Sequence, residues 1–160
     1  MDNKWEKSCC FFGHRKIEET SELTKRLKNV IENLIVKNNV NVFLFGSKSE
    51  FNSLCLNVVT ELKEKYPQII RIYVRAEYEI INDSYQNYLL KSYEKTYYPE
   101  KIKGAGKASY IKRNYEMIDK SKYCVVYYDE YYAPPRGKSG TKIAYYYAVK
   151  EKREIINVYK

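Results

Sequence analysis

The stretch SCCFFGHRK, residues 8 to 16, ends an apolar run with a glycine, the chain's single histidine and an arginine. An apolar run that stops at a turn-forming residue predicts a buried strand, and glycine lets the chain turn sharply at that point. Residues that follow such a strand are presented at the edge of a sheet. We therefore expect Gly13, His14 and Arg15 to lie where a ligand can reach them.

Short apolar runs of the same kind recur along the chain, and amphipathic helical patterns separate them. Residues 21–37 and 51–62 carry apolar residues at helical spacing. The strand-like runs are 9–12, 42–45, 69–74, 124–128 and 155–158. Continuous apolar strands that alternate with helices are typical of a parallel sheet buried on both faces. The pattern predicts an α/β fold, a Rossmann-like three-layer sandwich with a mostly parallel sheet of about five strands.

Length and composition narrow the function classes. The 160 residues suit one domain, residues 1–160, and 29 Lys and Arg against 20 Asp and Glu give a net charge of +9. That charge favours anionic partners such as nucleotides or nucleic acid. The four cysteines form no C-x-x-C pair, so we expect neither a metal site nor a bound cofactor. No run of eighteen apolar residues occurs, and we expect a cytoplasmic protein with no membrane partner.

Further candidate residues follow the other predicted strands. In sheets of this kind, ligands bind outside the carboxyl ends of the strands, where loops lead into helix N-termini. The expected ligand-binding residues beyond the first loop are Gly46, Ser47, Lys48, Lys138, Ser139, Gly140 and Thr141. Glycines, hydroxyls and lysines in such loops are the composition of a phosphate cradle. Glu77 follows the third strand and is a candidate acid or nucleophile.

Three separated segments resemble one known superfamily. They are the opening CCFFGHRKI, the segment FLFGSKSEFNSLCLNVVTELKEKYP and the region from RNYEMIDK to REIINV. These segments resemble the SLOG superfamily and, within it, small bacterial and phage proteins of the YoqJ and YpsA type. The resemblance implies a single SLOG-like domain with a Rossmann-like fold that binds nucleotides or nucleotide-derived molecules. It adds Arg113 and Asn114, which match a basic residue and an asparagine in the small relatives, and it implies a homodimer.

The sequence departs from the enzymes of that superfamily at one important position. Phosphoribohydrolases resembling this chain carry a segment Pro-Gly-Gly-x-Gly-Thr-x-x-Glu, whose glutamate assists N-glycosidic cleavage. The counterpart here is PRGKSGTKIAYYYA, and the two possible alignments put Ala144 or Tyr146 at the glutamate position. The same segment lacks the first glycine of a Walker A loop, since Tyr132 stands there. Phosphate binding tolerates these changes better than hydrolysis does.

Three functions remain open on the sequence. The first is a protein that binds a nucleotide or an NAD- or ADP-ribose-derived anion at the strand ends, without catalysis. The second is a phosphoribohydrolase or other N-glycosidase that uses Glu77. The third is a single-stranded nucleic-acid binder, in which the segment YYPEKIKGAGKASYIKRNY alternates basic residues with stacking aromatic rings. His14 and Arg15 also have a purely structural interpretation, in which they hold the strand end together.

Overall fold

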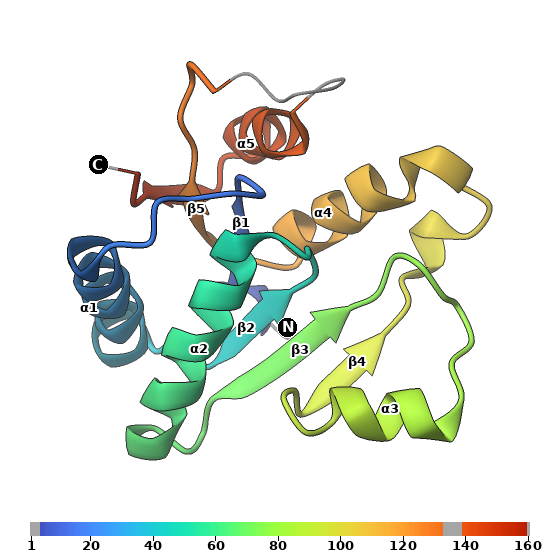
Figure 1. Cartoon of the computed structure of the whole chain (residues 1–160), viewed down its shortest axis with the longest axis horizontal. Coiled ribbons are helices and arrows are strands. Elements are labelled where there is room, and N and C mark those ends of the chain that lie inside the picture. The colour runs from blue at the N-terminus through green and yellow to red at the C-terminus, as the bar shows by residue number, and fades with distance from the viewer. Residues whose placement is uncertain (1–3, 133–138, 160) are drawn as a thin grey trace.

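A computed structural model describes residues 4–132 and 139–159, and the described part contains one parallel sheet (Figure 1). The strands are β1 (Ser8–Gly13), β2 (Val42–Phe45), β3 (Ile70–Val74), β4 (Lys95–Tyr97), β5 (Tyr123–Tyr127) and β6 (Glu154–Asn157). They run in the order β4-β3-β2-β1-β5-β6, and every pairing is parallel. The predicted α/β class is confirmed, with six described strands where about five were expected.

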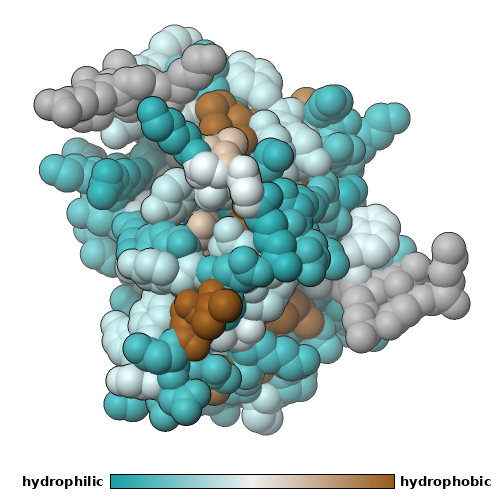
Figure 2. All heavy atoms as spheres, turned by 90° about the vertical axis from the view of Figure 1, so that its right-hand side faces the viewer, coloured by the Kyte–Doolittle hydropathy of each residue, from teal (hydrophilic) through white to brown (hydrophobic). Residues whose placement is uncertain are grey.

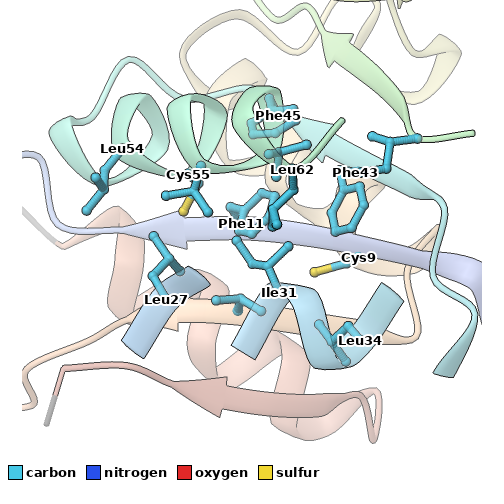
Figure 3. Packing of buried hydrophobic residues seen from close by; sticks show 14 of the residues in the cluster. Cys9, Phe11, Leu27, Ile31, Leu34, Phe43, Phe45, Leu54, Cys55 and Leu62 are labelled. Carbon is cyan, nitrogen blue, oxygen red and sulfur yellow. The ribbon is translucent and has the colours of Figure 1, made fainter. Parts of the chain in front are cut away.

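Helices cover both faces of this sheet. The helices are α1 (Ser21–Asn38), α2 (Glu50–Lys65), α3 (Asp83–Leu89), α4 (Ser109–Asp119) and α5 (Gly140–Lys150), with short 3-10 turns at Lys4–Lys7, Glu100–Ile102 and Gly106–Ala108. Helices α1, α2 and α3 pack on one face, and Figure 3 shows Leu27 and Ile31 of α1 meeting Phe11 beneath α2. Helices α4 and α5 pack on the other face, against Cys10, Phe12 and their neighbours. The result is the predicted three-layer sandwich.

Strand β4 is the strand that the sequence pattern did not predict. It has only three residues, Lys95, Thr96 and Tyr97, which are exposed or half-buried and pair with β3 at the edge of the sheet. An edge strand has one neighbour and mixed surroundings, so its sequence carries no continuous apolar run. The surrounding chain, from the end of β3 to the start of α4, contains only short elements.

The order of the strands reverses at β1. This strand lies between β2 and β5, so the chain moves outward through β2, β3 and β4 and then returns to the other side of β1. In open parallel sheets such a switch point leaves a crevice at the carboxyl ends of the strands. Side chains cap the helices that start at this edge: Ser49 accepts from the Asn52 amide, and Ser139 accepts from the Lys142 amide.

All four cysteines are buried in the sheet and the layer above it. Cys10 of β1 and Cys124 of β5 are paired in register, with their Sγ atoms 3.6 Å apart, and the thiols are free. Burial raises the pKa values of the Cys9 and Cys55 thiols well above the ordinary range. Within the described residues, no three His, Cys, Asp or Glu side chains gather as metal ligands would, and none of the helices has the length and apolar character needed to cross a bilayer.

Candidate functional site

Arg113 and Gly46 form the centre of the site. Arg113 projects from α4, is only 4% exposed, and donates from Nη1 to the carbonyl oxygen of Gly46, which follows β2. Its Nε donates to Asn114 Oδ1 at 3.0 Å. A Cβ atom on Gly46 would lie 2.6 Å from Cδ of Arg113, so glycine is required for this close approach. Two predicted binding segments, distant in the sequence, therefore meet at the carboxyl end of β2.

The Arg113 guanidinium has no carboxylate partner in residues 4–132 and 139–159. Burial lowers its pKa, and the tyrosines Tyr73 and Tyr110 and the carboxylate Glu77 act in the opposite direction. Glu77 is already paired with Lys48, whose Nζ lies 2.9 Å from a carboxylate oxygen. Because burying a charge without a counter-ion is unfavourable, this guanidinium favours an anion beside it.

Two more cations lie near Arg113. Arg75, directly after β3, donates to the backbone carbonyls of Tyr78 and Glu79 and to Thr96 Oγ1, each at 3.1 Å. Tyr73 acts electrostatically to raise the pKa values of Lys48, Arg75 and Arg113, so all three cations lie in the neighbourhood of this one β3 residue. The residues Gly46, Ser47, Lys48, Arg75, Glu77 and Arg113 are called the Arg113 corner below. It holds three cations and one carboxylate.

The loop between β2 and α2 uses much of its own hydrogen-bonding capacity. The Oγ atoms of Ser47 and Ser49 lie 2.9 Å apart, and the Glu50 amide donates to the carbonyl oxygen of Arg15 at 2.8 Å. The Glu50 carboxylate in turn accepts from the Ile17 amide. The first amides of α2 are thus partly used, so an anion at this corner would be bound mainly by side chains. The same bonds tie the loop after β1 to the loop after β2.

His14 lies deeper than expected. The side chain is 3% exposed, its Nε2 accepts from the Asp129 amide at 2.8 Å, and its ring stacks on Tyr132 with centroids 4.1 Å apart. Because Nε2 accepts, the proton of the neutral ring sits on Nδ1, and this buried atom has no partner among the described residues. Burial lowers the pKa of His14, so the ring is held neutral. Arg15, the next residue, is exposed.

The start of α5 forms a second group of predicted residues. Ser139 caps the helix, and the first turn contains no acidic residue. Gly140 faces open space, since a Cβ atom placed there would have nothing within 4 Å, whereas Thr141 is buried. Lys138 lies outside the described residues. This helix start can therefore accept an anion without displacing a carboxylate.

Positions that carry the glutamate in related enzymes lie on α5. Ala144 is buried in the apolar cluster beneath the helix, and Tyr146 is exposed on its outer side. Neither position supplies a carboxylate. Within the described chain, the candidate carboxylates that follow strand ends are Glu77 after β3 and the pair Asp129 and Glu130 after β5, and Glu77 forms an ion pair with Lys48.

The structure brings together some predicted residues and adds others. Gly46, Ser47, Lys48, Arg113 and Asn114 meet at one corner. Gly13 and Arg15 are linked to that corner through the start of α2, whereas His14 contacts the end of β5 and the residues after it. Sequence reasoning included the loop after the third strand, Arg75 to Tyr78, among the candidate loops but singled out only Glu77 in it, and it did not include Tyr73. Arg75 directly follows a predicted strand, and this position was the available signal; nothing in the sequence singled out Tyr73 from the other tyrosines.

Parallel strands, helices on both faces and a cationic corner at the carboxyl ends define a Rossmann-like α/β protein. A family model, YpsA, described as the YspA SLOG family, matches residues 7–159. Because the match covers nearly the whole chain, the protein belongs to this SLOG family, as the sequence motifs indicated. A search among curated proteins finds no match.

Proposed function

We propose that the protein binds a nucleotide or a nucleotide-derived anion, such as one derived from NAD or ADP-ribose, at the carboxyl ends of its strands, without catalysis. Membership of the SLOG family supports a nucleotide-related role. The observation that carries the proposal is the buried Arg113 guanidinium, which has a backbone carbonyl and an amide oxygen as partners but no carboxylate among the described residues.

The energetics of Arg113 favour a ligand with a phosphate group. Taking a charge out of water costs several kcal/mol unless a counter-ion and hydrogen bonds compensate. A phosphate oxygen supplies both, since guanidinium–phosphate hydrogen bonds are shorter and stronger than neutral ones. Lys48 and Arg75 add positive charge on the β2 and β3 side of the corner, and Glu77 offsets part of it.

Two observations disfavour the alternatives. The enzyme hypothesis needs a carboxylate where the related phosphoribohydrolases carry their glutamate, whereas that position is Ala144 or Tyr146 and Glu77 is ion-paired. The nucleic-acid hypothesis needs free cations in the segment 97–115. Lys101 lies 2.6 Å from Asp119 and Lys103 lies 3.0 Å from Glu79, so part of the basic character of that segment is neutralised within the chain.

Calorimetric titration with AMP, ADP-ribose, NAD and cyclic nucleotides tests the proposal, with thermal shift as a first screen. At least one ligand should bind, and Arg113→Met should weaken it roughly 10- to 100-fold, from about 1.5–3 kcal/mol for hydrogen bonds to a charged group. Arg153→Met is the matched control. Arg153 also donates to backbone carbonyls but lies just before β6, at the opposite edge of the sheet. Equal affinity in both variants and the unchanged protein would contradict the proposal.

A further inference from the structure

A tyrosine-lined groove adjoins the Arg113 corner. It is a cavity of about 910 Å³ between α2 and α3, above β3, and Ser47 and Lys48 form part of its wall. Tyr73 and Tyr93 are buried in it, with ring centroids 5.1 Å apart. Its volume lies within the range of about 300–1,000 Å³ that small-molecule sites occupy. The groove and the corner therefore share Ser47 and Lys48.

The outer wall of this groove is an aromatic platform on α3. Tyr85 and Tyr88 are three residues apart on one helix face, and their rings are nearly parallel, at 12° with centroids 6.2 Å apart. Tyr88 is 64% exposed although it carries a large ring. An exposed ring beside a cavity can stack on a planar ligand without any rearrangement of the core.

The polar groups of the groove are neutral. Serine hydroxyls and the amides Asn52, Asn57 and Asn82 line it, and Lys48 is the one charged residue among the described lining residues. Burial raises the pKa values of Tyr73 and Tyr93, so both hydroxyls stay protonated and can donate hydrogen bonds. Aromatic faces combined with neutral donors and acceptors suit a planar, uncharged, hydrogen-bonding ring.

The surroundings of the groove suit a small ligand better than they suit a protein or lipid partner. Figure 2 shows the side of the molecule that carries α3 and β4, which is mostly hydrophilic, with apolar residues in small separate groups. Protein interfaces and membrane-binding faces need a larger contiguous apolar area. A small planar ligand needs only the platform and the cavity.

We propose that the groove between α2 and α3 binds the nucleobase of the ligand whose phosphate lies at the Arg113 corner. This inference rests on the proposed function and adds to it the side of the sheet on which the base lies. Ser47 and Lys48 belong to both regions, so a nucleoside phosphate can reach from one to the other. The base would stack on Tyr88 and Tyr85, and the asparagines would meet its polar edge.

The test compares ligands with and without a base. The four nucleoside monophosphates and ribose 5-phosphate are titrated into the unchanged protein and into Tyr88→Ala, Tyr88→Phe and the control Trp5→Ala. Trp5 also carries an exposed aromatic ring but lies in the turn before β1, outside the groove and away from the carboxyl ends of the strands. Tyr88→Ala should weaken the best nucleotide roughly 5- to 100-fold, the range for one base stacked on an aromatic ring. Tyr88→Phe keeps the ring and should restore most of the affinity, and ribose 5-phosphate should bind all variants alike.

Different failures point to different errors. If nucleotides bind no better than ribose 5-phosphate, or if Tyr88→Ala leaves nucleotide affinity unchanged, the base does not lie in the groove, while the proposed function stands. If neither the nucleotides nor ribose 5-phosphate binds, the groove inference fails, and the proposed function fails with it when ADP-ribose, NAD and the cyclic nucleotides do not bind either. Circular dichroism of each variant checks that the fold is retained, and the exposure of Tyr88 makes a folding defect unexpected.

Discussion

Single atoms decide the geometry at the centre of the site. Gly46 follows β2 and has no Cβ atom. Arg113 Cδ and Met117 Sδ occupy the space that a Cβ atom would need. Gly140 is the opposite case, because open space surrounds it. Two glycines in predicted binding loops thus have different physical roles, one required by packing and the other compatible with a ligand.

Replacing Gly46 with alanine should destabilise the fold. The added Cβ would lie 2.6 Å from Arg113 Cδ and 2.9 Å from Met117 Sδ, so buried side chains must move. We expect a loss of about 1–3 kcal/mol in the free energy of unfolding, measured by urea denaturation. Gly140→Ala is the control and should leave stability unchanged or raise it slightly. A Gly46→Ala variant as stable as the unchanged protein would mean that the packing around Arg113 is loose.

His14 should make stability depend on pH. Burial lowers its pKa below the ordinary 6.5, against the opposing effects of the Asp129 amide and carboxylate, so the unfolded chain takes up a proton before the folded one does. The contribution is fully present above pH 6.5 and is lost as pH falls below it toward the folded pKa. Urea denaturation at pH 7.5 and 5.5 should show a smaller pH-dependent loss in His14→Asn. An identical loss in both proteins would mean that His14 does not titrate between these values.

Among the described helices, α5 is one of two that begin without an acidic residue. Helices α1, α2 and α3 carry an acidic residue in the first turn, whereas α4 and α5 have none, and α5 begins with Gly140. An acidic residue there would stabilise the helix dipole but would repel an anionic ligand. The absence of such a residue at α5 is compatible with the second anion position that the sequence predicts.

Gly140→Asp separates the two effects at this helix start. The aspartate should raise the free energy of unfolding by roughly 0.3–1 kcal/mol through the helix dipole, since nothing within 4 Å of the new Cβ blocks it. The same charge should weaken nucleotide binding, measured by calorimetry, if the ligand's phosphates approach this helix. Higher stability with unchanged affinity would restrict the ligand to the Arg113 corner and the groove beside it.

Elements with strong periodicity could be predicted from the sequence, and contacts between elements could not. Burial on both faces of the sheet produces the apolar runs of β1, β2, β3, β5 and β6. Burial of one helix face produces the apolar stripe of α1. Strand β4 was not predicted, because an edge strand of three mixed residues has no such pattern. The burial of Arg113 was not predicted either. An arginine among the polar residues of α4 is expected to be exposed, and only the structure shows that Gly46 packs against it.

At the scale of the whole molecule, charge is distributed unevenly along the edge of the sheet. In the segment 97–115, Lys101 pairs with both Glu116 and Asp119, while the buried Arg113 pairs with no described carboxylate. The net charge of +9 therefore overstates what a long polyanion would meet on that segment. A compact anion at one corner is the partner that this distribution favours.

The whole protein should bind its ligand without cleaving it. Incubation with nucleoside monophosphates or NAD should release no free base above the buffer background in chromatography, because Ala144 or Tyr146 stands at the glutamate position and Glu77 is paired with Lys48. Glu77→Gln is the control for any activity that does appear. Base release that is abolished in Glu77→Gln would establish the N-glycosidase alternative.

The four buried thiols also give the molecule an internal kinetic reporter. A water-soluble disulfide reagent can reach Cys9, Cys10, Cys55 or Cys124 only when the fold opens around them, since each is 0% exposed. Cys10 and Cys124 lie on β1 and β5, the two strands that flank the switch point, whereas Cys55 lies on α2 beside the groove. Labelling rates, resolved cysteine by cysteine with mass spectrometry, would therefore measure how often each part of the sheet edge opens and which part a bound ligand keeps closed.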